Sequence, residues 1–421
     1  MKNKTNISSL INLALHYKKN INLEKNSLYD KYIDKFLENI EEHVSSILEP
    51  SVLQGLIQLD KFDAVSSFFD KRPELLTANS ELRYLHGHAL LKHGRIRDAL
   101  RHWSEVKNAE SLNRFLPIRS NQLLKYPEAS LGNILLQDTE PEVHVLILTH
   151  NREKYLRNTL SCLAKTLYSN YRVYIVDNGS SDSTRTVLQS ASDFFPSNIK
   201  ITTQSLPTNI GRPAGHNWLI TNWNHSSAEY IAILDDDMLD FEPHWLRSFI
   251  NTFTIKPNIG AVGGKTIGHD FLIQDATSVI LPPSPEGYVC FHTNRGETDW
   301  GQYNYISNTS DYIIGCASAF KREIFDTAGL FDIRFSPSQG VDIDHGLRMR
   351  KAGYDLMYNG NCTFVHAQLT SVELDQDRPR LGNSLGNFLK LGYKYSAEEF
   401  QQIICARLDR EKQLISTCGE F

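Results

Sequence analysis

Short apolar runs alternate with amphipathic stretches in the middle of the chain. Three of these runs, residues 143–148, 171–176 and 230–234, have the length of a buried strand, about four to eight residues. Residues 199–203 predict a further strand between the second and the last of them. Between the first two, Leu156, Leu160, Leu163 and Leu167 recur at helical spacing, which predicts a helix with one buried face and Asn151 as its N-cap. This alternation predicts a parallel sheet with right-handed crossovers.

The first 135 residues have a different pattern, with leucine and isoleucine at helical spacing and no strand-type alternation. Residues 56–65 resemble residues 90–100 at an offset of about 34–35 residues, the period of tetratricopeptide helix pairs. Two copies are fewer than the roughly three that such repeats need for stability. We therefore expect a helical domain that packs on its neighbour, on a protein partner or on a second copy of the chain. A helical domain without repeats is the alternative.

The later part of the chain is mixed. Residues 259–264 and 313–320 predict two more strands, the first ending in a glycine turn, and residues 266–305 indicate loops. An amphipathic helix would end at Gly353, and a last strand would end on His366.

The C-terminal region begins with a helix signal. Ser396 and Glu399 have the spacing of a capping box, which opens a charged helix. We expect three parts, with a linker near residues 126–141: a helical domain at 1–135, an α/β domain at 142–371 and a helical extension at 372–421.

The composition is that of an ordinary globular protein. The 421 residues are 41% hydrophobic and 22% charged, and the net charge of −5 gives no basic field for nucleic acid. The six cysteines form no C-x-x-C pair, and neither a signal peptide nor a membrane-spanning run is evident. We expect a cytoplasmic protein and leave open peripheral contact with the inner membrane.

The run Asp235, Asp236 and Asp237 follows directly on the fourth predicted strand. Ligands of open α/β sheets bind beyond the carboxyl ends of the strands. Adjacent carboxylates repel one another unless water or a cation lies between them, and their oxygens suit Mg²⁺ and Mn²⁺. Such an ion can bridge protein carboxylates to a diphosphate. A solvated acidic turn is the alternative, while the dinucleotide-binding and P-loop signatures are absent.

Several weak motifs occur in a fixed order between residues 143 and 371. They are Thr149-His150-Asn151-Arg152, Asp177-Asn178-Gly179, Asn209-Ile210-Gly211, Asp235-Asp236-Asp237, Asp299-Trp300-Gly301-Gln302, Gly329-Leu330-Phe331-Asp332, Asp342-Ile343-Asp344 and Val365-His366. In this order they resemble the family 2 glycosyltransferases, in particular rhamnosyltransferase-like bacterial members. The resemblance implies an α/β GT-A fold, a Rossmann-like mixed sheet flanked by helices, beside the all-α N-terminal domain.

The resemblance also implies a nucleotide site. Asp177 is similar to the carboxylate that accepts from the imide N–H of uracil or thymine; its alternative is an Asx turn before the next helix. The other expected nucleotide contacts, for which turn, capping or surface roles are the alternatives, are Thr149, Asn151, Arg152, Asn209, Gly211, Arg212, Asp235 and Asp236.

Metal and base are assigned by the same resemblance. Asp237 and His366 are the expected ligands of Mn²⁺ or Mg²⁺. Asp342 aligns with the family's catalytic base, and Asp344 would then be structural, through the helix cap or Arg348. Val341 stands where the family usually has Glu, which leaves open whether Asp342 or Asp344 is the base. Trp300 either stacks on a sugar or packs in a core.

The resemblance implies an inverting, metal-dependent glycosyltransferase that uses a UDP- or dTDP-sugar. Its acceptor would be a hydroxyl of a glycan, a lipid-linked molecule or a protein, in bacterial surface glycan synthesis. Two alternatives remain: an inactive GT-A module that still binds nucleotide sugars, and a helical-repeat adaptor.

Overall fold

The computed structural model describes residues 62–78, 80–106, 116–125, 140–269, 272–297, 299, 301–367 and 378–416. The chain divides into two compact units. The first is mainly Met1–Pro127, and the second is Glu128–Asp299 with Tyr303–Thr417.

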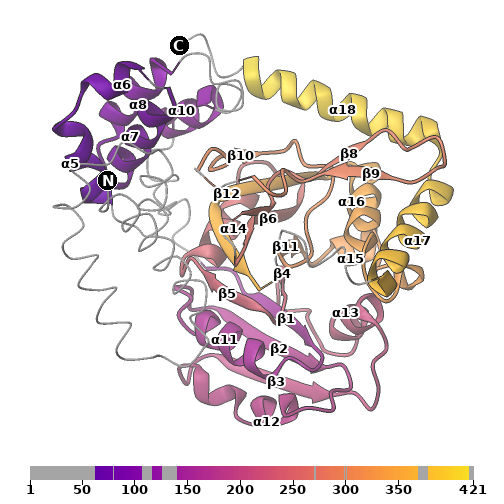
Figure 1. The fold of residues 1–421 in the computed structure, drawn as a ribbon. Coiled ribbons are helices and arrows are strands. Elements are labelled where there is room, and N and C mark those ends of the chain that lie inside the picture. Colours follow the sequence, from indigo (N-terminus) through magenta and orange to yellow (C-terminus); the bar gives the residue numbers. More distant parts are fainter. Residues whose placement is uncertain are drawn as a thin grey trace. The chain divides into compact units, whose positions relative to one another are not determined.

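The described part of the first unit is helical, as the sequence predicts (Figure 1). Its helices are α5 (Phe62–Asp70), α6 (Glu74–Ala78), α7 (Ser80–Lys92), α8 (Ile96–Ser104) and α10 (Leu116–Lys125). Gly94 has a φ of +72° in the turn between α7 and α8, and Ala99 and Trp103 of α8 lie in the core. Residues 90–100, the second copy of the expected repeat, lie at the end of α7, in this turn and at the start of α8. Most of the first copy lies outside the described residues, so the repeat stays a prediction.

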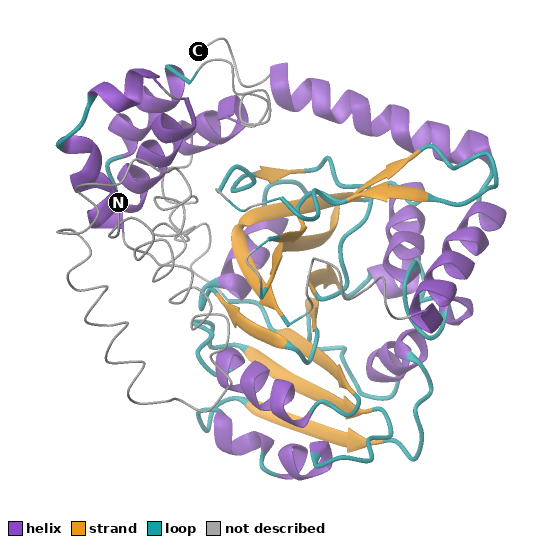
Figure 2. Cartoon of the chain, in the orientation of Figure 1, coloured by secondary structure: helices purple, strands orange, loops and turns teal. Residues whose placement is uncertain are grey.

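A mixed sheet forms the centre of the second unit (Figure 2). Its strands, in spatial order, are β10 (Ile306–Ser307), β12 (Asp355–His366), β6 (Ile259–Gly268), β11 (Ala317–Lys321), β4 (Tyr230–Leu234), β1 (Val143–Thr149), β2 (Tyr171–Asp177) and β3 (Lys200–Ser205). The four strands expected to be parallel are so, with β1 between β2 and β4. Strand β11 runs antiparallel between β4 and β6.

Helices cover both faces of this sheet, because successive side chains of a strand point to opposite sides. Val145 and Ile147 of β1 pack with α11 (Glu153–Leu163) and α14 (Trp245–Phe253). Leu146, between them, belongs to a second core with α13 (Arg212–Thr221), α15 (Ile324–Thr327) and α16 (Val341–Lys351). Such sandwiching explains why β1 and β4 are almost continuously apolar. The fold expectation of a mixed sheet flanked by helices is confirmed.

The remaining elements include two short strands of the same sheet, one paired with β12 and one with β6. These elements are α12 (Thr184–Gln189), the 3-10 turns η2 (Ala191–Phe194) and η3 (Ile333–Phe335), β5 (Met238–Phe241), β7 (Ile273–Asp275), β8 (Val279–Leu281), β9 (Cys290–His292), α17 (Arg378–Lys394) and α18 (Ala397–Ser416). The capping box of α18 is confirmed: Ser396 N–H donates to Glu399 Oε2 at 2.8 Å, and Glu399 N–H donates to Ser396 Oγ at 3.2 Å.

Three local expectations are wrong. Asn151 does not cap α11; the N-cap is Arg152, and Asn151 has a φ of +52°. Leu167 lies beyond the end of α11 and is 53% exposed. Residues 266–305 are not only loops, because β7, β8 and β9 lie within them.

Strand β6 also does not end at its glycines. It continues through Gly264 to Gly268. A Cβ on Gly263 would lie 2.4 Å from Ile313, and one on Gly264 would lie 2.5 Å from the Phe364 ring. These glycines allow close packing within the sheet rather than a turn.

Candidate functional site

The parallel strands bring their C-terminal residues to one edge of the sheet. Thr149, at the end of β1, is in register with Asp177 at the end of β2. Asp235 follows Leu234 directly, where β4 ends. All five residues of β4 are buried, so the strand fixes where the carboxylates emerge.

The chain then returns His366 to the same edge. Directly after Asp237, β5 pairs antiparallel with β12, and Met238 lies opposite His366. The Asp237 carbonyl also accepts a hydrogen bond from the N–H of Ala367 at 3.0 Å. The structure therefore places Asp237 and His366 together, although 129 positions separate them in the sequence.

Asp235, Asp237 and His366 form a compact group whose possible ligand atoms lie within 4.8 Å of one another. His366 Nε2 lies 2.7 Å from Asp237 Oδ1, and both residues are buried. Burial acts to raise the pKa of Asp237, but the charge of His366 outweighs it and the pKa is lowered. The pKa of His366 is raised, because Asp237 outweighs the effect of its own burial. Two carboxylates and an imidazole at this spacing can hold a metal ion.

Asp236 has a different environment from its two neighbours. Burial and the adjacent Asp237 raise its pKa to about 7, although the nearby Thr149 hydroxyl acts in the opposite direction. Arg152, whose side chain is 41% exposed, has Nη2 at 3.9 Å from Asp237 Oδ2. Thr149, Arg152 and Asp236 thus lie beside this candidate metal-binding group.

Arg212 connects this group to Asp342. Its Nη2 donates to Asp235 Oδ1 at 2.9 Å, and its Nη1 lies 3.9 Å from Asp342 Oδ1. The N–H of Gly315 donates to Asp342 Oδ2 at 3.2 Å. A Cβ at Gly315 would lie 2.9 Å from Arg212 Nη2, so a larger residue there would displace the guanidinium. One arginine therefore separates and orients the two carboxylates.

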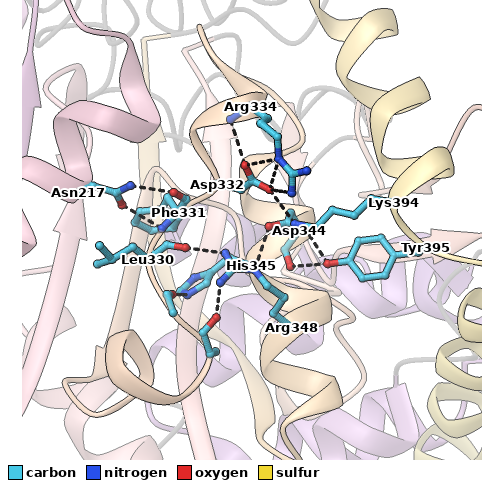
Figure 3. A network of polar contacts seen from close by, with 12 residues as sticks. Asn217, Leu330, Phe331, Asp332, Arg334, Asp344, His345, Arg348, Lys394 and Tyr395 are labelled. Atoms are coloured by element: carbon cyan, nitrogen blue, oxygen red, sulfur yellow. Dashed lines mark hydrogen bonds and ion pairs between the residues drawn. The ribbon is translucent and has the colours of Figure 1, made fainter.

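Asp344, two residues after Asp342 on α16, has a different environment. Figure 3 shows it among three donors: Arg348 Nε at 2.9 Å, Tyr395 Oη at 2.7 Å and Lys394 Nζ at 2.5 Å. Its side chain is fully buried, whereas that of Asp342 is 20% exposed. The expected bond between Asp344 and Arg348 is present.

The remaining expected nucleotide contacts lie at the end of β2 and in the loops after β1 and β3. The fully buried Asp177 accepts from Ser180 N–H at 2.8 Å and from Arg185 Nε at 3.1 Å. Asn151 Oδ1 accepts from Ser181 N–H at 2.8 Å. Both residues thus make the bonds expected of residues that stabilise turns. Their nucleotide-binding roles stay predictions.

Asn209 and Gly211 shape the loop before α13. Asn209 Oδ1 accepts from Asn178 Nδ2 at 3.0 Å and from the Gly211 N–H at 2.8 Å. Gly211 has a φ of +85°, which glycine adopts without strain. The loop leads directly into Arg212, the first residue of α13.

Gln274 is a site residue that sequence reasoning missed. Its side chain lies 2.8 Å from Nδ1 of His366, on the ring edge opposite Asp237. It lies in the stretch expected to be loops, where no local pattern indicates a role. Trp300 lies outside the described residues.

The mixed sheet, with carboxylates at the C-terminal ends of its parallel strands, defines an α/β domain with a candidate site at that edge. Residues 144–328 match the family model described as "Glycosyl transferase family 2". These residues of the chain thus resemble a family 2 glycosyltransferase domain.

Parts of the chain are also similar to curated proteins and to solved structures. An uncharacterized protein, y4gI, of Sinorhizobium fredii is 27% identical over 55% of this chain and 25% of its own length. The chondroitin synthase of Escherichia coli is 25% identical over 63% of this chain and 40% of its own length. The chain therefore spans well under half of these relatives. A solved mannosyltransferase from Pyrobaculum calidifontis, in complex with GDP-Man and Mn²⁺, covers 74% of this chain and 88% of its own, with 17% identity and a TM-score of 0.45.

Among the described residues, no helix combines the length and the apolar character needed to cross a bilayer.

Proposed function

We propose that the chain is an inverting, metal-dependent glycosyltransferase that moves a sugar from a UDP- or dTDP-sugar to a hydroxyl acceptor. The observation that carries the proposal is the arrangement of Asp235, Asp237 and His366 around one position, with Asp342 joined to them through Arg212. Both parts of such a reaction, a diphosphate clamp and an acceptor base, then lie at one edge of the sheet.

The proposed metal site consists of Asp237 and His366, with Asp235 as a third ligand or a contact to a metal-bound water. Carboxylate oxygens suit Mg²⁺ and Mn²⁺, and an imidazole favours a transition ion, so Mn²⁺ fits better than Mg²⁺. When bound, the cation would neutralise charge on the diphosphate leaving group.

Asp342 is the proposed base. Its carboxylate is partly exposed and keeps acceptor capacity beyond the single Gly315 N–H bond. Asp344 is saturated by three donors and buried, which favours Asp342 over Asp344. An inverting transfer needs one such carboxylate to take the acceptor's proton as the hydroxyl attacks. Arg212 would keep Asp342 and Asp235 apart in the metal-free site.

The nucleotide would lie along the ends of β1 and β2. Asp177, Thr149 and the loop through Asn209 and Gly211 surround this edge, and Arg152 and Asp236 lie at its boundary with the metal ligands. On this proposal Asp177 exchanges its turn bond or its Arg185 partner for the imide N–H of the base. Domain limits of 1–135, 142–371 and 372–421, a cytoplasmic location and a role in bacterial surface glycan synthesis complete the proposal.

A donor panel tests this function. The full chain is incubated with UDP- and dTDP-sugars, with Mn²⁺ or with a chelator, and nucleotide release is measured. We expect release from at least one donor, dependent on the metal, and a transferred sugar whose anomeric configuration is inverted by NMR. Absence of release with every donor, or retained configuration, would contradict the proposal. Deleting residues 1–135 should preserve donor hydrolysis, whereas an adaptor would lose its activity.

A further inference from the structure

The metal-ligating group has a polar neighbour on the side away from the carboxylates. Gln274 lies in β7, which pairs antiparallel with β6, and β6 pairs in parallel with β12, the strand that ends on His366. This pairing brings the Gln274 Oε1 to 2.8 Å from His366 Nδ1. Gln274 is 8% exposed and His366 is 2% exposed, so little water competes for the contact.

The bond determines which ring nitrogen can bind a cation. An amide oxygen only accepts, so Nδ1 of His366 must carry the hydrogen. In the neutral imidazole, the lone pair is then on Nε2, which faces Asp237 Oδ1 at 2.7 Å. Without an acceptor at Nδ1, the proton could move to Nε2 and the ring could rotate, and either change removes the lone pair from the metal position.

We propose that Gln274 is a positioning residue of the metal site. It fixes the Nδ1–H tautomer and the orientation of His366, so that Nε2 points at the space between Asp235 and Asp237. The assignment rests on the proposed metal dependence. Partners of this kind typically change metal affinity by roughly 10–100-fold when they are removed.

Binding of Mn²⁺ alone tests this role without reference to catalysis. The full chain is titrated with Mn²⁺ in the absence of donor, and free Mn²⁺ is measured by electron paramagnetic resonance. Gln274→Met keeps the shape and removes the acceptor, and we expect Mn²⁺ affinity to fall about 10–100-fold. Gln274→Glu keeps an acceptor oxygen toward Nδ1, and we expect it to bind at least as tightly as the wild type.

A matched control removes a bond to the backbone of β7 without changing the side-chain amide of Gln274. Thr293 Oγ donates to the backbone carbonyl of Gln274 at 3.1 Å, so Thr293→Val removes a local bond and should leave Mn²⁺ affinity unchanged. If Gln274→Met does not fold, Gln274→Ala serves in its place. Affinity within twofold of wild type in a folded Gln274→Met or Gln274→Ala protein overturns the inference. A wild type that binds no Mn²⁺ overturns the proposed metal dependence itself, which is a distinguishable result.

Discussion

Two clusters of charged side chains in the second unit differ in how completely their carboxylates are paired. Under α16, Asp344 has three donors around it, and the adjacent Asp332 accepts from Lys394 at 2.8 Å and pairs with Arg334 (Figure 3). The sheet edge has fewer basic side chains for each carboxylate. Its four carboxylates lie beside only three such side chains within the described residues: Asp235, Asp236, Asp237 and Asp342 beside Arg152, Arg212 and His366.

On the proposed function, this difference separates a structural cluster from a functional one. A buried carboxylate with saturated acceptors stabilises the packing around it and has no capacity left for a ligand. An excess of partly paired carboxylates is unfavourable in free energy without a bound cation. Burial and mutual repulsion disfavour the ionised forms of Asp235 and Asp236 and therefore raise the pKa of each. That cost is relieved when a cation binds. The following predictions test whether the two clusters differ in this way.

The largest expected effect is on catalysis. Asp342→Asn removes the proposed base while keeping the side-chain shape, and we expect the transfer rate to fall by about 10²–10⁴-fold. Nucleotide binding, measured by calorimetry with UDP and Mn²⁺, should be retained. Asp326→Asn, at an acidic residue of α15 that is 75% exposed, serves as the control. Full activity of Asp342→Asn would remove this residue from the mechanism.

The next effect is on stability. Asp344→Ala leaves Arg348, Lys394 and Tyr395 without their shared acceptor. We expect a loss of about 3–5 kcal/mol in the free energy of unfolding, as for other broken buried pairs. Urea denaturation followed by circular dichroism measures it. A change below about 1 kcal/mol, the scale of an exposed pair, would show that the cluster is not structural.

The smallest effect concerns pH. Arg334, and after it Lys394, hold the pKa of Asp332 well below its usual range. A carboxylate with a lowered pKa contributes stability above its unfolded pKa of about 4 and loses it as pH falls toward the folded value. Asp332→Asn should therefore lower the melting temperature at neutral pH, and the gap to wild type should narrow below about pH 4. Because Arg334 is largely exposed, the gap should be smaller than for Asp344→Ala. An equal gap at neutral and acid pH would contradict this account.

The sequence predicts the elements whose pattern is local. Three of the four parallel strands, β1, β2 and β4, follow from apolar runs of ordinary length, and the capping box at Ser396 needs only neighbours three residues apart. Strands of three residues such as β8 and β9 give no such signal, because their pairing partner and not their own pattern defines them. The prediction that Asn151 caps α11 is wrong for a related reason. Its side chain serves the loop after β2, about 30 positions away.

The candidate site shows the same limit. The Asp run marks the strand end by itself, but only the family resemblance relates it to His366, because no local pattern spans that distance. Gln274 has neither signal, since its contact with His366 depends on the neighbouring strands β6 and β12. Likewise, the choice between Asp342 and Asp344 needs the burial and the partners of each side chain.

The central claim is that the carboxylates at the sheet edge hold a divalent cation, and a Mn²⁺ titration of the wild type and of Asp237→Asn tests it most directly. We predict one Mn²⁺ site in the wild type that is weakened more than about 100-fold in the variant, because a direct ligand should matter more than the outer-shell partners that change affinity 10–100-fold. Equal affinity in both proteins, or no binding in the wild type, would contradict it.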